Sequence, residues 1–373
     1  MRLLITLVLA VLAQSLYAET ERDPLRVTFI NPDARGNAFW DNFSSFMAAA
    51  AKDLGVELRI LYADKASRFE YQQLSSAILA SPRRPDALVT ILKRNAARRL
   101  FSECAEYRVD CFTVNTDLPS GEHGSIGKPR EKFAHWVGQT LPDDKDAGEQ
   151  LANILMQQFR LLPVSDSPRR GYMVALNGSG DSSAALERGE GLFQAIQGQP
   201  EVVFRQLLFT DWDSGLAYEK MAKLLERYPG TNIIWGASDA IALAATRAMT
   251  ENGKLPGQDF VAGGIDWSRE GIEAVRKGQL NVSIGGHFIE GAIALVLLHD
   301  RYHGKDFAND FGVRYKIKLR AIDAASPEQE IRRLQNQDWE PIDFGRFSKI
   351  KNSALDTYDF SIDNMLFGNP TEQ

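Results

Sequence analysis

The sequence contains only two cysteines and five histidines among its 373 residues. Two cysteines cannot supply a four-ligand metal site, and neither of them has a neighbouring histidine. The histidines show no His-Glu-x-x-His spacing, so we expect surface positions for them: His123, His135, His287, His299 and His303. An excess of positive charge is also lacking, because the formal net charge is −6. The chain therefore predicts neither a metal centre nor a nucleic-acid partner.

Motifs for catalysis are absent as well. The Gly-rich stretch 177–180 is not followed by the Lys-Ser/Thr pair of a phosphate-binding P-loop. No Gly-x-Ser-x-Gly nucleophile elbow occurs. We therefore expect a protein that is not an enzyme and needs no cofactor, with a secreted enzyme as the less favoured alternative.

A long apolar run occurs only at the N-terminus. Arg2 precedes a mostly apolar stretch from Leu3 to Ala13, which is interrupted at Gln14. This run is shorter than the roughly 20 residues of a membrane-spanning helix, although an N-terminal anchor is the alternative. A basic start, an apolar centre and a small residue at Ala18 are typical of a secretory signal peptide. Residues 1–18 are thus predicted to be removed, and the mature chain to reside in the periplasm.

The two cysteines, Cys104 and Cys111, are predicted near the end of a helix and in the following strand. A disulfide between them is plausible in an oxidising compartment. Its formation depends on a Cα separation below about 7 Å, which the sequence does not show.

From Leu25 onward, apolar strands alternate with amphipathic helices. In the first half we expect strands at 25–31, 56–62, 87–92 and 109–115, with helices at 38–54, 68–80 and up to Tyr107. In the second half we expect strands at 171–177, 202–209, 232–236, 260–266 and 281–284, with helices at 184–197, 215–228, 239–252 and 268–277. This pattern predicts an α/β fold with parallel sheets covered by helices on both faces. The roughly 355 residues after Ala18 exceed one compact core, so two lobes are expected.

Ligands of open parallel sheets bind at the carboxyl ends of the strands. The candidate ligand-binding residues at or just after these strand ends are Asn37, Phe39, Trp40, Lys93, Asn115, Asp181, Trp212, Ser238, Asp266 and His287. One further candidate, Arg188, lies within a predicted helix. Aromatic rings can cover the C–H face of a sugar, while carboxylates and amides bind its hydroxyls. Taken singly, such Ser, Asn and Asp residues often only cap the next helix. Their convergence on one cleft would favour a small polar, sugar-like ligand.

The stretch 177–192, with its Glu-Arg-Gly-Glu-Gly string, resembles type I periplasmic sugar-binding proteins of the ribose-binding kind. Further matches in the expected order are Asn37-Ala-Phe-Trp40, Ser238-Asp-Ala-Ile-Ala-Leu243 and Gly263-Gly-Ile-Asp266, and the resemblance covers about 25–319. It implies two Rossmann-like lobes joined by a hinge, which close on the ligand and present it to an inner-membrane ABC permease. The implied lobes are 24–138 plus about 288–312, and 139–287 plus about 313–338.

The resemblance also implies roles for individual residues. Phe39 and Trp40 would sandwich the ligand with Trp212, Arg188 would donate from its forked guanidinium, and Asp266 would accept from two hydroxyls. Arg188 could instead be a surface residue paired with a neighbouring glutamate. Departures from the family pattern occur at Lys93, Asn115-Thr116, Ser238 and Gly286-His287. These departures argue against ribose and against pyranoses bound in the ordinary pattern.

A second resemblance, at Ser326-Pro-Glu-Gln-Glu-Ile331 and the helix beginning at Ser238-Asp, is to the periplasmic autoinducer-2 receptor. It implies a competing role as the ligand-sensing subunit of a membrane signalling receptor. The stretch 339–373 lies beyond the usual end of the fold and is rich in aromatic residues, which argues against a disordered tail. We expect it to pack on the lobes of a monomer, with docking to a membrane partner as the alternative.

Overall fold

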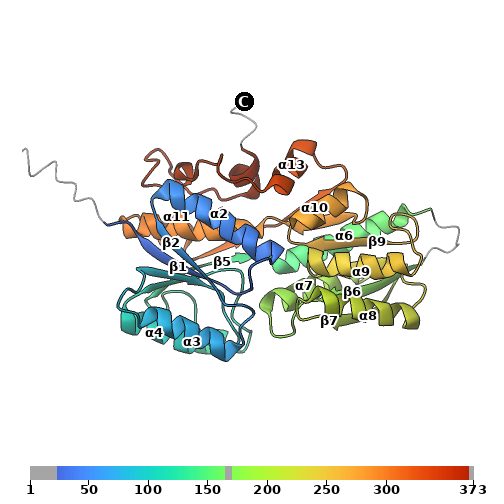
Figure 1. The fold of residues 1–373 in the computed structure, drawn as a ribbon, viewed down its shortest axis with the longest axis horizontal. Helices are drawn as coiled ribbons and strands as arrows, with labels where there is room; N and C mark the ends of the chain where they lie inside the picture. Colours follow the sequence, from blue (N-terminus) through green and yellow to red (C-terminus); the bar gives the residue numbers. More distant parts are fainter. Residues whose placement is uncertain (1–22, 164–169, 369–373) are drawn as a thin grey trace, which may run out of the picture.

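The computed structural model describes residues 23–163 and 170–368. Two α/β lobes lie side by side, each around a six-stranded sheet (Figure 1). The predicted signal peptide lies outside the described residues. Within them, no helix is long and apolar enough to span a membrane.

The first lobe is built on a fully parallel sheet with the strand order β11-β5-β4-β3-β1-β2. Its strands are β1 (Arg26–Asn31), β2 (Glu57–Tyr62), β3 (Ala87–Thr90), β4 (Asp110–Thr113), β5 (Trp136–Pro142) and β11 (Arg314–Ile317). Its helices are α2 (Ala38–Leu54), α3 (Arg68–Leu79), α4 (Ala97–Tyr107), α5 (His123–Ile126), α11 (Glu290–Tyr302) and α12 (Ala308–Phe311). In Figure 1, α2 and α11 cover one face of this sheet, and α3 and α4 cover the other.

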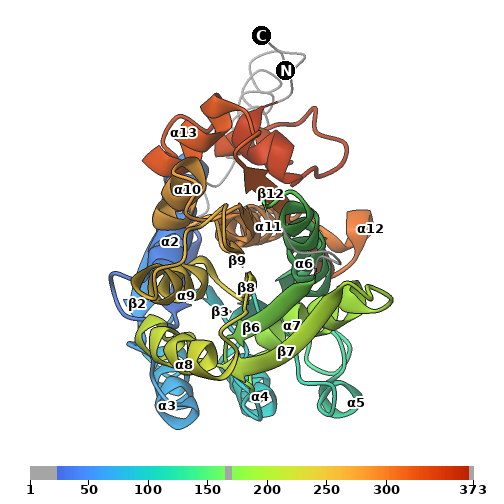
Figure 2. The same ribbon diagram turned by 90° about the vertical axis from the view of Figure 1, so that its right-hand side faces the viewer.

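The second lobe repeats the arrangement with the order β12-β10-β9-β8-β6-β7 (Figure 2). Its strands are β6 (Gly171–Asn177), β7 (Val202–Phe209), β8 (Ile233–Gly236), β9 (Val261–Ile265), β10 (Val282–Gly285) and β12 (Arg320–Asp323). Its helices are α6 (Asp144–Arg160), α7 (Ser183–Ile196), α8 (Ser214–Arg227), α9 (Asp239–Glu251), α10 (Arg269–Arg276) and α13 (Glu328–Asn336). All strand pairs are parallel except β10 with β12. The two-lobed α/β fold with parallel sheets is thus confirmed.

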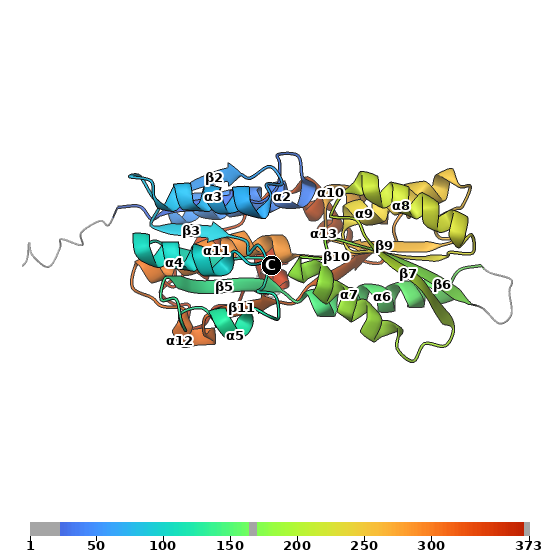
Figure 3. The same ribbon diagram turned by 90° about the horizontal axis from the view of Figure 1, so that it is seen from below.

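The chain passes between the two sheets at three places (Figure 3), before the C-terminal stretch spans both lobes again. The first passage follows β5, the second runs through η1 (His287–Ile289), and the third links β11 to β12. The sequence-based lobe boundaries at 138 and 313 differ from these passages. β5 continues in the first sheet to Pro142, and β11 pairs with β5 rather than with the second sheet. The boundaries therefore fall after Pro142 and after Ile317, because strand pairing decides them.

The C-terminal stretch packs on both lobes, on the side of α2, α11 and α10 (Figure 1). We call residues 339–368 the strap. Trp339 is 3% exposed and stacks on Phe288, with 5.2 Å between the ring centroids. The short helices η2 (Phe344–Phe347) and η3 (Asp363–Phe367) lie within the strap.

The strap returns to the second lobe near the second passage. The strap residue Ile362 packs directly against Gly286, whose φ is +109°. A Cβ added at Gly286 would lie only 2.2 Å from Cδ1 of Ile362, so no larger residue fits there. Asp363 forms an ion pair with Arg320, the first residue of β12. The strap therefore connects both lobes across the hinge.

Cys104 and Cys111 form a disulfide with a Cα separation of 6.2 Å, which meets the condition stated above. The expectation that all histidines lie at the surface is wrong for two of them. His287 is 1% and His299 3% exposed. His299 sits on α11 beside Asp300, whose carboxylate receives hydrogen bonds from the strap residues Ser348 and Tyr358.

Candidate functional site

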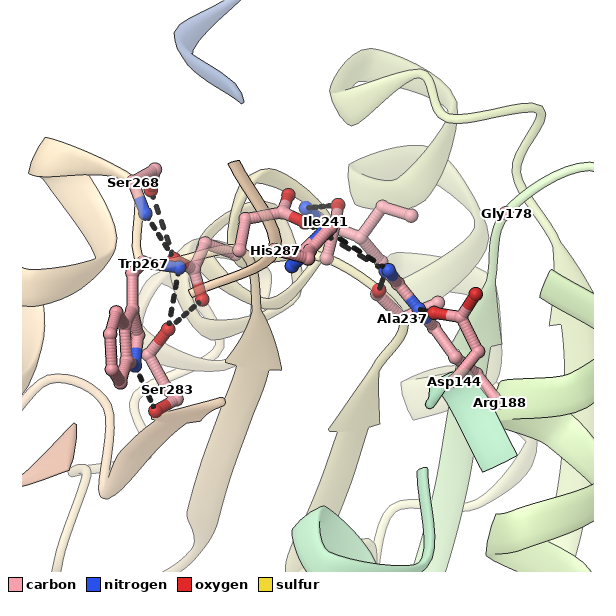
Figure 4. Close-up of polar contacts among 12 residues, drawn as sticks. Asp144, Gly178, Arg188, Ala237, Ile241, Trp267, Ser268, Ser283 and His287 are labelled. Carbon is pink, nitrogen blue, oxygen red and sulfur yellow. Dashed lines mark hydrogen bonds and ion pairs between the residues drawn. The ribbon is translucent and has the colours of Figure 1, made fainter. Parts of the chain in front are cut away.

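Arg188 lies on α7 of the second lobe, and its side chain is 3% exposed. Its Nε donates to Oδ1 of Asp144 at 2.6 Å, and its Nη1 donates to the carbonyl of Ala237 at 2.7 Å (Figure 4). Burial disfavours the charged guanidinium, but neighbouring carboxylates prevail and raise its pKa. Arg188 is thus a fixed, buried cation rather than a surface residue paired with Glu187 or Glu190.

Asp266 follows β9 and lies beside this cation. Its Oδ1 is 3.7 Å from Nη1 of Arg188 and 3.6 Å from Nε2 of His287. The backbone φ of Asp266 is +141°, a conformation that L-residues rarely adopt. Burial raises the pKa of this carboxyl well above its ordinary value, and the nearby Asp239 adds to the effect while Arg188 opposes it. Such strained, perturbed groups cluster at functional sites.

His287 completes a triangle with Arg188 and Asp266. Its Nε2 is 3.4 Å from Nη2 of Arg188, and its ring stacks on Phe39 with 4.5 Å between centroids. Burial, and secondly Arg188, lower the pKa of His287 well below its usual range, so the ring is neutral. Its Nδ1 is buried and has no hydrogen-bond partner among the described residues. This nitrogen is therefore a polar atom of the triangle that the described residues leave unused.

The three predicted aromatic residues are placed differently from one another. Phe39 is half-buried and faces His287. Trp40 packs toward the core of the first lobe, with its ring 5.2 Å from that of Phe43. Trp212 lies under Arg188, whose guanidinium carbon is 5.7 Å from the ring centroid. A Cβ at Gly178 would lie 2.2 Å from the Trp212 ring, so Gly178 makes room for it. Phe39 and Trp212 thus lie next to the triangle of Arg188, Asp266 and His287.

Several predicted site residues have structural roles here. Asn37 caps α2 by accepting from the N–H of Trp40, and Ser238 caps α9 by accepting from that of Ile241. Asn115 donates its backbone N–H to Glu290 on α11 at 2.8 Å. The capping alternative therefore applies to Asn37 and Ser238, whose side-chain oxygens are engaged by the backbone.

Lys93 and Asp181 come from opposite lobes. Lys93 is half-buried, and burial lowers its pKa while Asp181 opposes this change. The exposed Asp181 accepts from the hydroxyl of Ser179 at 2.8 Å. A direct bond between the lobes is made where the backbone N–H of Asp117 donates to Oγ of Ser183 at 2.9 Å. The lobes are therefore in contact on this side of the cleft.

The prediction missed Asp239 as an organising residue. Its buried carboxylate accepts from the N–H and the hydroxyl of Ser268 and from the hydroxyl of Ser283. Burial raises its pKa to about 6. These bonds hold the loop that follows β9 and so position Asp266. An Asp after a strand looks like a cap in the sequence, and only the fold shows its partners.

A cavity of about 340 Å³ lies between the lobes, next to the Arg188 cluster. Its lining combines the first-lobe residues Asn115, Asp117, Leu141, Pro142, Arg314, Tyr315 and Lys316 with the second-lobe residues Asp144, Ser183 and Glu187. Of the predicted site residues, the cavity includes only Asn115. Leu141, Pro142, Asp144, Arg314, Tyr315 and Lys316 were missed because β5, α6 and β11 were not recognised as neighbours of the cleft.

No group of three or more Cys, His, Asp or Glu side chains among residues 23–163 and 170–368 could hold a metal ion. The cluster instead offers a forked cation, a carboxylate, a neutral imidazole and aromatic faces. This set can hydrogen-bond a hydroxylated ligand and cover its apolar face.

Comparison with known proteins gives a consistent result. A family model described as a periplasmic binding protein domain matches residues 27–306. The solved structure of a periplasmic sugar-binding protein from Pseudomonas fluorescens is 30% identical, with a TM-score of 0.81. That likeness covers 91% of this chain and 99% of the other.

Curated relatives are more distant or match in part. The ribose import binding protein of Salmonella typhimurium is 32% identical over 112 residues, which are 30% of this chain and 36% of the relative. The matched region thus spans about a third of that relative's length. The D-allose-binding periplasmic protein of Escherichia coli is 22% identical, over 84% of this chain and 94% of the relative.

Proposed function

Because this chain belongs to the periplasmic binding protein family, whose members are non-enzymatic solute-binding proteins, we propose that it closes on a small sugar-like ligand and delivers it to an ABC transporter in the inner membrane. The observation that carries this proposal is the triangle of Arg188, Asp266 and His287. It lies where the second passage joins the lobes, with Phe39 of the first lobe stacked against it.

The triangle suits a neutral, hydroxylated ligand. Arg188 supplies N–H donors, Asp266 supplies acceptor oxygens, and Nδ1 of His287 supplies one unused polar atom. Phe39 and Trp212 supply flat apolar faces of the kind that the C–H groups of a sugar cover. The relatives named above bear the names of sugar-binding proteins, which supports the same ligand class.

Hinge closure is the mechanism that this site implies. The triangle combines second-lobe residues with the passage through His287, and Phe39 belongs to the first lobe. A ligand that contacts both lobes binds more tightly to the closed arrangement, and this difference in affinity shifts the equilibrium toward closure. The closed protein is then the form that a permease recognises.

The test is isothermal titration with D-ribose, D-allose, D-galactose, L-arabinose and D-fructose, on the wild type and on Asp266→Asn. We expect one of these sugars to bind to the wild type. Asp266→Asn should bind it at least about tenfold more weakly, because a hydroxyl of the sugar loses the carboxylate that accepts its hydrogen bond. Asp211→Asn is the matched control, since Asp211 is an exposed second-lobe carboxylate outside the triangle. Failure of every sugar to bind, or equal binding by both variants, contradicts the proposal.

Delivery to a sensor instead of a transporter is the alternative that the resemblance to the autoinducer-2 receptor implies. Transport predicts that the sugar-loaded protein stimulates ATP hydrolysis by a permease in membranes, whereas sensing predicts co-purification with a membrane kinase or cyclase.

A further inference from the structure

The cavity beside Arg188 is built from both lobes. Asn115 and Asp117 follow β4, Leu141 and Pro142 end β5, and Glu187 comes from α7. Its volume of about 340 Å³ falls within the range of roughly 300–1,000 Å³ that is usual for small-molecule sites. An occupant would contact both lobes and would therefore favour closure in the same way as a ligand at the triangle.

Asp144 connects the cavity to the triangle. Its carboxylate lines the cavity and accepts from Nε of Arg188, whereas Nη1 and Nη2 of Arg188 lie near Asp266 and His287. The cavity and the triangle thus lie at opposite edges of one guanidinium group. Arg188, Asp266 and His287 do not themselves line the cavity, so a single ligand would have to be longer than one ring to contact both places.

The charges around the cavity largely cancel within the protein. Asp117 is paired with Arg314, and Asp144 is paired with Arg188. Lys316 is paired with Asp143, with 2.9 Å between Nζ and Oδ1. These three pairs are neutral, so apart from Glu187 the described lining residues offer no net charge to a strongly charged ligand group. The lining instead offers separate hydrogen-bond donors and acceptors around the apolar side chains of Leu141 and Pro142.

Glu187 is the exception, because its carboxyl group has no hydrogen bond or ion pair with any residue that the structure describes. Burial, and secondly Asp144, raise its pKa to about 7. Near neutral pH this group therefore exists in both forms, and it can donate a hydrogen bond as well as accept one. Such a group suits a hydroxyl, which is itself both donor and acceptor.

We propose that this cavity is a subsite for a second sugar unit, so that the ligand is a disaccharide or glycoside whose first ring lies at the Arg188 triangle. The inference rests on the proposed function, since it assumes a sugar at the triangle. Glu187 forms a hydrogen bond with a hydroxyl of the second ring. The paired charges of the other lining residues disfavour a second sugar unit that carries a strong charge.

The experiment compares ligands of two lengths on matched variants. The monosaccharide that binds best in the panel above is titrated alongside disaccharides that carry the same ring in each available linkage, such as lactose and melibiose for D-galactose or sucrose for D-fructose. These ligands are measured on the wild type, on Glu187→Ala and on Glu190→Ala. Glu190 lies one helical turn away on α7 and is exposed, so it is the matched control.

We expect at least one disaccharide to bind about tenfold or more tightly than its monosaccharide, and Glu187→Ala to abolish that gain. Affinity for the monosaccharide should change less than about threefold in either variant, and Glu190→Ala should behave as the wild type. If no disaccharide binds more tightly than the monosaccharide, or if Glu187→Ala leaves the gain intact, the subsite is refuted while the proposed function stands. If no saccharide of either length binds, the proposed function itself fails.

Discussion

Arg188 and Asp144 form a buried ion pair that joins α7 to the start of α6, with their side chains 3% and 4% exposed. The pair places the guanidinium group where its other edge reaches Asp266 and His287. The same bond therefore supports the fold of the second lobe and orients the candidate binding group. This double role has consequences for how the site can be tested.

Arg188→Ala should destabilise the protein as well as abolish ligand binding. It removes the one ion-pair partner that Asp144 has among residues 23–163 and 170–368 and leaves this carboxylate buried without compensation, at a cost of about 3–5 kcal/mol. Urea unfolding followed by circular dichroism measures the free energy of unfolding. The double variant Arg188→Met with Asp144→Leu should recover much of that loss, because it removes both charges. A loss below about 1 kcal/mol in the single variant would show that Asp144 finds another partner.

Local patterns were sufficient to predict most of the fold. The bounds of α2, β6 and β7 agree with those predicted, because each element has clear apolar periodicity and a defined end, such as Gly55 after α2. The lobe boundaries were displaced because they depend on the pairing of β5 with β11, strands far apart in sequence. Hydrophobic patterns carry no information on such pairing.

The candidate site was predictable only in part, for a similar reason. Strand ends identified Asp266 and His287 as candidates, and the family string identified Arg188. The same rule also selected Asn37 and Ser238, which cap helices. Nothing local distinguishes a capping side chain from a ligand-binding one, because the difference is which partner the fold brings near. Glu187 and Lys316 were missed since they lie within a helix and within a strand that was not recognised.

Glu290, at the start of α11, should contribute a fall in stability as the pH rises from about 4.5 to about 8, whereas the lowered pKa of His287 contributes a rise up to about pH 6.5. Burial raises the pKa of the Glu290 carboxyl group from 4.5 to about 8, although hydrogen bonds from Asn115 and Thr140 oppose the shift. In this window the folded protein holds a proton that the unfolded chain releases, so folding is favoured at the lower pH. One such group contributes a slope of up to about 1.4 kcal/mol per pH unit.

Glu290→Gln should flatten this dependence and stabilise the protein at pH 8 relative to the wild type. The amide oxygen of glutamine can accept the same two hydrogen bonds without a buried charge. Glu290 is not the only such group, because the pKa values of four other carboxyl groups are also raised: Asp239, Glu187, Asp266 and Asp144. These groups retain part of the slope in the same direction in both proteins, so the difference between the two proteins reports Glu290 alone. Thermal unfolding between pH 5 and pH 8 measures both proteins. An identical pH profile for the two would mean that Glu290 is not the group responsible.

Trp339→Ala should destabilise the whole protein, because the strap belongs to the hydrophobic core. The Trp339 ring contacts Phe46 and Phe288, and its Nε1 donates to Oδ1 of Asn42 at 2.9 Å. Truncating such a buried tryptophan costs about 3–5 kcal/mol through the lost contacts and the cavity left behind. Thr357→Ala is the control, since Thr357 is an exposed residue of the same strap. The prediction is contradicted if Trp339→Ala and Thr357→Ala unfold at the same urea concentration. That result would mean that the buried face of the strap does not stabilise the fold.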